Sequence, residues 1–563
     1  MDNGDNLPNV VFLVVDSARS YSTGGLDDRD KLDMMDRFAG ESVFFSTAVS
    51  SAPSSIMAAS AILTSLPAYY IARNYDDFKY DDDLFISLPK ILKAAGYEIK
   101  SVMNALETRE KFYNLLPHVS KIYWPQGIKH DQVRWPNSVV NDILDRYLAT
   151  CDKGRPHFLW VWYNIREDST TSSELERALA LLKKHGLWDN TLLVLCSDHG
   201  YIDPRRGYTP ELLKARGLTH DLVMTEDNIR IPLYIRFPDS PVKQLDVPVT
   251  SLDLMPTILE YLGLGYPTHA PTRMHGLSLL PLINNHQPVL EDFLHRKLRC
   301  DARFFAQSDR STVIRGTRYK YLVRPDQAQE EFYDLVADPW EEHNLISEAA
   351  LQGEISTFRA AYRQDEEQAV RFQTAYLISK LNGTIQRALE ESGHGIIVVG
   401  LGDPYYLDII TSVFREVFGD TPFDLIISTD RASRMTNLTP YRRVFEYTLE
   451  SAGQAHIASP HDRSDLLRRE YSLKLILADT RNEHTFARHR KALEPLIKFK
   501  TELAIDPNMQ ALSRTTAKSN WKFLFQTAYR NRSYYWSNPR IFLRHVRMGV
   551  GLLGHRLVTR SSR

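Results

Sequence analysis

The sequence is poor in cysteine and has none among its first 150 residues. The three that occur, Cys151, Cys196 and Cys300, are an odd number without zinc-type spacing. This pattern argues against a disulfide framework and favours a reducing compartment. No run of 18 apolar residues occurs, so no membrane-spanning helix is expected. The leader MDNGDNLPN is polar and unlike a signal peptide, and a cytoplasmic protein is therefore expected.

An excess of charge of either sign is also absent, because the formal net charge is −1. General binding to polyanions is thereby disfavoured, and no nucleic-acid partner is expected. The exception is the stretch from Asn508 to Arg563, which contains no Asp or Glu while Arg and Lys recur. At 563 residues the chain is too long for one ordinary core, and two or three domains are expected.

What the sequence does contain is a series of short, buried-looking strands that alternate with helical patterns. The strands are VVFLVVD (10–16), HFLWVWYN (157–164), TLLVLCS (191–197) and IPLYIRF (231–237). This alternation predicts an α/β fold in which a mostly parallel central sheet is sandwiched by helices. Ligands of such sheets bind beyond the carboxyl ends of the strands, where Asp16 and Asp198 stand.

These strand ends also suggest a metal site. Asp16, Asp198 and the adjacent His199, with a hydroxyl at the start of a helix, would suit one divalent cation. Carboxylate and imidazole ligands are compatible with Ca, Mg, Mn or Zn, and the sequence leaves that choice open. The ion would stabilise the hydroxyl as an alkoxide and withdraw charge from a sulfuryl or phosphoryl oxygen.

The order and spacing of several motifs carry a resemblance. They are NVVFLVVDSARS, KLDMMDRFAGESVFFSTAVSSAPSS, AILTSLPA, LLVLCSDHG, LTHDLVMTEDNIRIPLYIRFP, TSLDLMPTILEYLGL, HGLSLLPLI, and RYKYL with EEFYDLVADPWEEHNL. Over residues 8–346 the chain resembles the sulfatase family of the alkaline-phosphatase-like superfamily. The resemblance implies an alkaline-phosphatase-like fold and the hydrolysis or transfer of sulfate and phosphate esters.

The resemblance also implies roles for particular residues. Asp16 matches the first acidic metal ligand, and Asp198 and His199 match the later ligand pair. His220 matches a basic residue that touches the transferred anion or protonates the leaving group. Arg19 matches an arginine of the DSxR branch, where a contact to the substrate anion and a structural ion pair both remain open.

The nucleophile is sought among the serines of SAPSS, residues 51–55. Many family members carry Cys-x-Pro-Ser-Arg, whose cysteine becomes formylglycine, and Ser51 imitates that cysteine. Counting back ten residues from Ser65, which replaces the glycine of the family's LLTG, gives Ser55 instead. Ser55 also directly precedes the apolar helix IMAASAILT, whose N-terminus would favour an anion. Ser55 is the preferred nucleophile and metal-site hydroxyl, Ser51 and Ser54 are alternatives, and no formylglycine is expected.

The sequence departs from the family pattern at two further places. Ser17 replaces the second acid of the usual pair, and YNIREDS stands where His-x-Pro-Tyr is common. These departures favour a hydroxyl-nucleophile branch with one metal, which includes phosphodiesterases and headgroup transferases. The leading hypothesis is a metal-dependent sulfate or phosphate ester hydrolase acting through Ser55. The alternatives are a phospho-headgroup transferase acting on a glycan or lipid-linked saccharide, and an inactive binding module.

The rest of the chain is expected to form further parts. Residues 347–392 are charged and helical and predict a connector, and 393–507 predict a small α/β domain beginning at GIIVVGLGD. The single GxG there favours a tight turn over dinucleotide binding. Residues 508–563 would form a basic tail. Its arginines at 540, 544 and 547 have helical spacing, and either contact with an anionic membrane or packing on the second domain would accommodate them.

Overall fold

The chain divides into two compact units, residues 1–369 and 370–563, and the division falls within helix α13 (Gln352–Glu390). Each unit is described by itself. The computed structural model describes residues 7–20, 33–67, 70, 85–103, 136–165, 170–207, 223–239, 241–268, 272–303, 310–324, 329–390, 395–401, 404–418, 421, 423–433, 441–449, 454–457, 459–477, 492–505 and 511–515.

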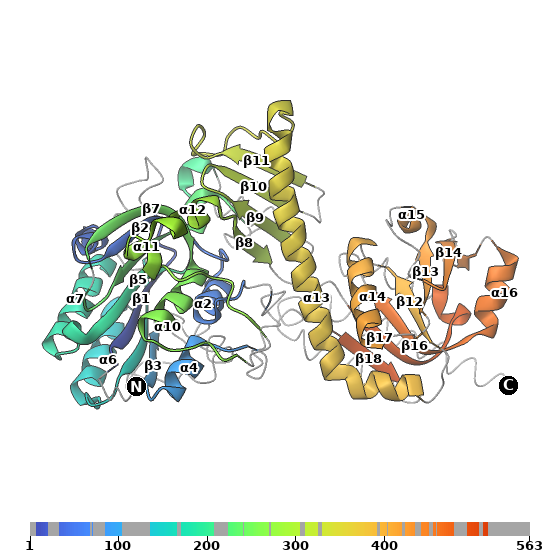
Figure 1. The fold of residues 1–563 in the computed structure, drawn as a ribbon, viewed down its shortest axis with the longest axis horizontal. Helices are drawn as coiled ribbons and strands as arrows, with labels where there is room; N and C mark the ends of the chain where they lie inside the picture. Colours follow the sequence, from blue (N-terminus) through green and yellow to red (C-terminus); the bar gives the residue numbers. More distant parts are fainter. Residues whose placement is uncertain are drawn as a thin grey trace. The chain divides into compact units, whose positions relative to one another are not determined.

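The first unit is built on a seven-stranded sheet (Figure 1). Its order is β3 (Glu98–Met103), β4 (His157–Asn164), β1 (Asn9–Asp16), β5 (Thr191–Ser197), β6 (Arg230–Arg236), β2 (Val43–Val49) and β7 (Lys243–Thr250). Only β6 pairs antiparallel with its neighbours. The mostly parallel sheet expected from the sequence is therefore confirmed.

Helices lie on both faces of this sheet. Figure 1 shows α6 (Asn137–Thr150) and α7 (Thr171–Lys184) on one side, and α2 (Ser55–Thr64) and α10 (Leu254–Tyr261) on the other. The shorter helices of the unit are α1 (Asp33–Phe38), α4 (Leu88–Ala94), α9 (Glu226–Ile229), α11 (Leu280–Ile283) and α12 (Gln287–His295). Strands buried on both faces explain why β1, β4 and β5 read as continuous apolar runs.

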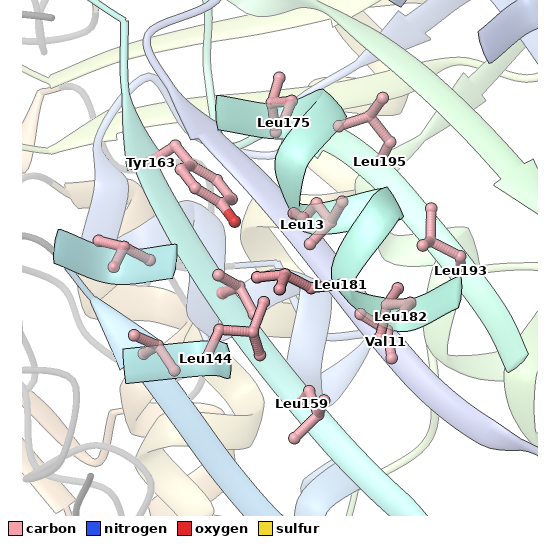
Figure 2. Close-up of a cluster of buried hydrophobic side chains, with 14 of the residues drawn as sticks. Val11, Leu13, Leu144, Leu159, Tyr163, Leu175, Leu181, Leu182, Leu193 and Leu195 are labelled. Carbon is pink, nitrogen blue, oxygen red and sulfur yellow. The ribbon is translucent and has the colours of Figure 1, made fainter. Parts of the chain in front are cut away.

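Figure 2 shows the core under α6 and α7. Alternate residues of β1 and β5, such as Val11, Leu13 and Leu195, point towards leucines of the two helices, including Leu144 and Leu182. Fully burying such side chains contributes about 1.5 to 3 kcal/mol each. This packing holds β1 and β5 in position against α6 and α7, and so determines where the carboxyl ends of the strands lie.

The first unit also contains a four-stranded antiparallel sheet that the strand pattern did not predict. Its order is β11 (Gln329–Asp334), β10 (Tyr319–Arg324), β9 (Arg310–Arg315) and β8 (Leu298–Arg303). The first turns of α13 pack against it through Ile355 and Phe358, which contact Ile314, Tyr321 and Phe332. Helix α13 itself is a single helix of 39 residues.

The second unit is a smaller α/β domain with its own seven-stranded sheet, and the expected second α/β domain is confirmed. The strand order is β15 (Ala455–His456), β14 (Arg443–Leu449), β13 (Phe423–Ser428), β12 (Ile396–Gly400), β16 (Glu470–Leu477), β17 (Lys498–Ile505) and β18 (Ala511–Thr515). One face packs on α14 (Pro404–Phe418), and the other packs on α16 (Pro460–Arg468). A four-residue helix, α15 (Thr429–Ala432), follows β13.

Strand β18 corrects one boundary, because the small domain was expected to end at residue 507. Residues 511–515 pair antiparallel with β17 and extend the sheet. The more distal tail, with Arg540, Arg544 and Arg547, lies outside the described residues. Over the part of the chain that is described, no helix combines the length and apolar character needed to span a bilayer.

Candidate active site

The candidate site lies at the carboxyl ends of the neighbouring strands β1 and β5. Asp16 is the last residue of β1, and Asp198 and His199 directly follow β5. One ligand atom from each of the three side chains lies within 4.8 Å of the others. The structure thus brings together three of the four residues that the sequence suggested for the metal site.

Ser55 lies at the same place but comes from a different segment of the chain. It is the first residue of α2, and its Oγ lies 3.2 Å from Nε2 of His199. A hydroxyl at this position lies at the positive end of the helix dipole, where unbonded backbone N–H groups can hold an anion. The position therefore suits a serine whose oxygen must carry negative charge.

The orientation of His199 is fixed by its second ring nitrogen. Nδ1 lies 2.7 Å from the carbonyl oxygen of Gly200, and because a carbonyl only accepts, Nδ1 carries the proton. In the neutral ring Nε2 is then left with a lone pair. That nitrogen faces Ser55, lies 3.3 Å from Oδ2 of Asp198 and lies 3.9 Å from Oδ1 of Asp16.

Gly200 has a steric reason to be glycine. A Cβ atom there would lie 2.1 Å from the carbonyl oxygen of Asp227. The Gly200 N–H donates to the Asn228 carbonyl at 2.8 Å, so the chain after His199 runs directly against the segment of α9. This close backbone approach fixes the carbonyl that orients His199.

Asp198 is fully buried and is not fully satisfied by hydrogen bonds. Its Oδ1 accepts the N–H of Ser17 at 3.0 Å, whereas its Oδ2 has no hydrogen-bond partner among the described residues. Burial raises the pKa of Asp198 to about 6; His199 and the Ser17 N–H lower it, and the charge of Asp16 raises it. A buried carboxylate oxygen without a partner is unfavourable unless another group meets it.

These features fit a divalent cation. The donors are two carboxylates, which are ligands of Zn, Mn, Mg and Ca, and an imidazole, which is a ligand of transition metals such as Zn. The unbonded Oδ2 of Asp198 is directed into the same cluster as Nε2 of His199. Asp16, Asp198 and His199 would hold the ion. Ser55 is close enough to His199 for the charge of that ion to stabilise the Ser55 oxygen.

The other candidate serines are placed differently. Ser51 is fully buried, its N–H donates to Oγ of Ser251 at 3.1 Å, and its carbonyl accepts the N–H of Asp301 at 2.9 Å. Ser54 is buried at the N-cap of α2. Neither hydroxyl has a hydrogen-bond partner among the described residues, whereas that of Ser55 meets His199.

Ser65, from which the ten-residue spacing was counted, has a left-handed backbone with φ of 54° and caps the end of α2. Such a position normally favours glycine, which accounts for the family's glycine at this point.

Arg19 and His220 are the remaining predicted residues. Nη1 of Arg19 lies 2.9 Å from Oδ2 of Asp203, and both side chains are buried. Asp203 also binds the side chain of Arg205. This geometry gives Arg19 a structural ion pair, which is one of its two open interpretations. His220 lies outside the described residues.

A buried set of charges continues from this ion pair. Asp227 accepts from the N–H of Asp203 and pairs with Arg206, which also pairs with Glu341 at 3.0 Å. Lys320, fully buried on β10, pairs with both Glu341 and Glu226. Burial alone would raise the pKa of Glu226, but Arg315 and Lys320 outweigh it and lower the pKa to about 2. Ion pairs of Lys320 and Arg315 thus connect the four-stranded sheet to Glu226, at the start of α9.

The match to known proteins agrees with this arrangement. The model of the family "N-sulphoglucosamine sulphohydrolase, C-terminal" matches residues 216–368. An ulvan-active sulfatase of Formosa agariphila is 23% identical over 418 residues, which is 61% of this chain and 78% of that protein. The multifunctional alkaline phosphatase superfamily protein PehA of Trinickia caryophylli is 32% identical over 190 residues, 31% of this chain and 34% of that protein.

Solved structures extend the likeness to the fold. A structure of a putative sulfatase from Bacteroides thetaiotaomicron aligns with a TM-score of 0.51 and 16% identity, over 64% of this chain and 92% of that chain. Most of the curated relatives are matched over less of their length, since the chain spans 28% to 39% of seven of them.

The strand-end cluster, the fold and these matches converge on one assignment. The family model covers the segment that includes the four-stranded sheet, and the ulvan-active sulfatase aligns over most of its own length. The chain is thus similar in sequence to sulfatases and shares the fold of a putative sulfatase.

Proposed function

We propose that the chain is a metal-dependent hydrolase of sulfate or phosphate esters and that Ser55 is its nucleophile. The observation that carries the proposal is the convergence of Asp16, Asp198, His199 and the Ser55 hydroxyl at one edge of the sheet. Relatives named as sulfatases and a relative named as a multifunctional alkaline phosphatase superfamily protein support both classes of ester.

The proposed reaction has two stages. The Ser55 hydroxyl gives up its proton to solvent, its Oγ forms a bond to the sulfur or phosphorus atom, and the bond to the ester oxygen breaks as that oxygen takes up a proton and leaves as an alcohol. Asp16, Asp198 and His199 would hold a divalent ion, which supplies positive charge that stabilises the Ser55 alkoxide and the developing charge on the transferred group. The N-terminus of α2 would add to this stabilisation because Ser55 is the first residue of that helix. Water then releases sulfate or phosphate from Ser55.

His220 is proposed to protonate the departing ester oxygen or to contact the transferred anion. This role comes from its match to the family motif LTHDLVMTEDNIRIPL. An anionic glycan ester is the proposed substrate class. Relatives named as an ulvan-active sulfatase and an N-acetylglucosamine-6-O-sulfatase support a saccharide.

The test combines metal analysis with a substrate panel. Purified protein is assayed for bound metal and then offered aryl sulfates, phosphate monoesters, phosphodiesters and sulfated saccharides. Ser55→Ala should reduce turnover by several orders of magnitude, as expected for loss of a covalent nucleophile. Ser51→Ala is the matched control in the same loop and should cost far less.

Each outcome decides between readings of the site. Equal losses in Ser55→Ala and Ser51→Ala, or a loss in Ser51→Ala alone, would contradict Ser55 as nucleophile. A product in which an added acceptor alcohol carries the sulfuryl or phosphoryl group would identify a transferase instead. Metal-free protein that turns over none of these substrates even after metal is added would favour a binding module.

A further inference from the structure

Ser17, the residue directly after Asp16, has an unusual backbone. Its φ is 65°, in the left-handed region that favours glycine, and its side chain is buried. Non-glycine residues in this conformation are uncommon and persist where surrounding contacts hold them. Serine at this position therefore implies contacts, at least one of which glycine could not make.

Those contacts run to both acids of the candidate site. The N–H of Ser17 donates to Oδ1 of Asp198 at 3.0 Å, and its hydroxyl donates to Oδ1 of Asp16 at 2.8 Å. One residue thus gives a separate donor to each of two carboxylates that come from different strands.

The two bonds determine which oxygen atoms stay available. Because Ser17 occupies Oδ1 of Asp198, the unbonded oxygen of that buried carboxylate is Oδ2, which lies 3.3 Å from Nε2 of His199. The bonds also offset repulsion between two acids that share one small site. A neutral donor at position 17 leaves two carboxylate charges to balance one divalent ion, whereas an acid there would add a third.

We propose that Ser17 is a positioning residue that orients Asp16 and Asp198 for a divalent cation, and that its hydroxyl is required for this role. The inference rests on the proposed metal site and adds to it a residue that does not need to touch the ion. Hydrogen-bonding partners of metal ligands typically change metal affinity by about 10- to 100-fold when they are removed.

The experiment measures Mn²⁺ binding to the metal-free full-length protein by isothermal titration calorimetry. Ser17→Ala removes the hydroxyl and keeps the N–H donor, and Ser17→Gly removes the hydroxyl while relieving the left-handed backbone. Both should bind Mn²⁺ about tenfold more weakly than the wild-type protein. Ser17→Gly should melt at a higher temperature than Ser17→Ala, because glycine adopts this φ without strain.

Ser42→Ala is the matched control. Ser42 is also fully buried in the first unit, and its hydroxyl donates to the Phe38 carbonyl at 2.7 Å, away from the two acids. This variant should lose thermal stability but bind Mn²⁺ with wild-type affinity.

The possible results separate this inference from the proposed function. If the wild-type protein binds Mn²⁺ and both Ser17 variants bind it equally well, the positioning role is wrong and the metal site stands. Wild-type affinity in Ser17→Gly with loss in Ser17→Ala would assign the effect to the backbone, which also overturns the role of the hydroxyl. If the wild-type protein itself binds none of Mn²⁺, Zn²⁺, Mg²⁺ and Ca²⁺, both the metal site and the role of Ser17 are wrong.

Discussion

Each unit of the chain buries an acid in a parallel sheet, yet the two acids are treated in opposite ways. Asp424, in the second unit, lies near the amino end of β13 and accepts two bonds from Arg442 and one from Tyr471. Asp198 follows the carboxyl end of β5 and keeps one oxygen without a hydrogen bond among the described residues. A satisfied buried acid stabilises a fold, whereas an unsatisfied one is typical of a functional site.

The same contrast extends to the strand ends. In the first unit β1 ends at Asp16, and β5 runs into the buried Asp198 and His199. In the second unit β12, β13 and β16 end at Gly400, Ser428 and Leu477, and β13 runs into the exposed Thr429 and Asp430. Two described groups of acids and histidines are close enough to share an ion, Asp16–Asp198–His199 and the more exposed Asp338–Glu342–His343, and both lie in the first unit. Similar sheets therefore do not imply similar chemistry, which depends on the residues at the strand ends.

The largest expected effect comes from Asp198→Asn, which keeps the shape of the side chain and removes its charge. Metal binding should be lost, and hydrolysis should fall by roughly a thousandfold or more, because several kcal/mol of charge stabilisation disappear. The melting temperature of the metal-free protein should hold or rise, since a buried charge is removed. If Asp198→Asn instead lost as much stability as a substitution of a structural acid such as Asp424, the comparison between the two acids would be contradicted.

The sequence predicted the place of this site because it depends on topology. A short apolar strand that stops at Asp16, and another that stops before Asp198, must deliver both acids to one edge of a parallel sheet. Ser55 is proposed from its spacing to Ser65 and from the helix that follows it. These are periodic or positional features, which a single sequence displays directly.

Other features could not be read in this way. Strands β8 to β10 carry Arg299, Arg315 and Lys320, which are buried, and charged residues in a sequence normally indicate exposure. Their partners, such as Glu226 and Glu366, are distant along the chain. The left-handed φ of Ser17 was equally hidden, because glycine is the residue that signals such a position. Ser17 was noted only as a departure from a family motif.

The next largest effect is expected from Lys320→Met in the first unit. Lys320 is fully buried between Glu226 and Glu341, and removing it leaves two buried carboxylates with less compensation. Breaking such a pair typically costs roughly 3 to 5 kcal/mol of unfolding free energy. Chemical denaturation should show this loss in the transition of the first unit, with that of the second unit unchanged. A neutral result would mean that the remaining arginines satisfy both acids.

The stability of the metal-free protein should also depend on pH through Asp198. Its folded pKa of about 6 lies above the ordinary aspartate value of 3.8, so the folded protein binds the proton more tightly than the unfolded chain. The contribution of Asp198 is therefore most favourable below about pH 4 and is lost as the pH rises through 6. The loss should be at most about 3 kcal/mol, given 1.36 kcal/mol for each pKa unit.

Asp198→Asn is the reference for that measurement, because other acids change with pH in the opposite sense. Glu226, whose folded pKa is about 2, contributes stability that is lost as the pH falls from its unfolded value towards 2. Denaturation curves from pH 5 to 7 should show that the wild-type protein loses more stability with rising pH than the variant does. Parallel curves would mean that Asp198 ionises normally.

The smallest expected effect returns to the second unit and its satisfied acid. Asp424→Asn would remove charge-assisted bonds to Arg442 and weaken the bond from the buried Tyr471 hydroxyl. Because the Arg442 side chain is 40% exposed and water can compensate it, the cost should be about 2 kcal/mol of unfolding free energy. The substitution should leave Mn²⁺ affinity and the hydrolysis rate at wild-type values. Asp424→Asn is thus expected to lose stability and keep activity, whereas Asp198→Asn is expected to lose activity and keep stability. A fall in hydrolysis at a temperature where the second unit is folded would show that this unit takes part in the reaction, and the contrast between a structural and a functional acid would then fail.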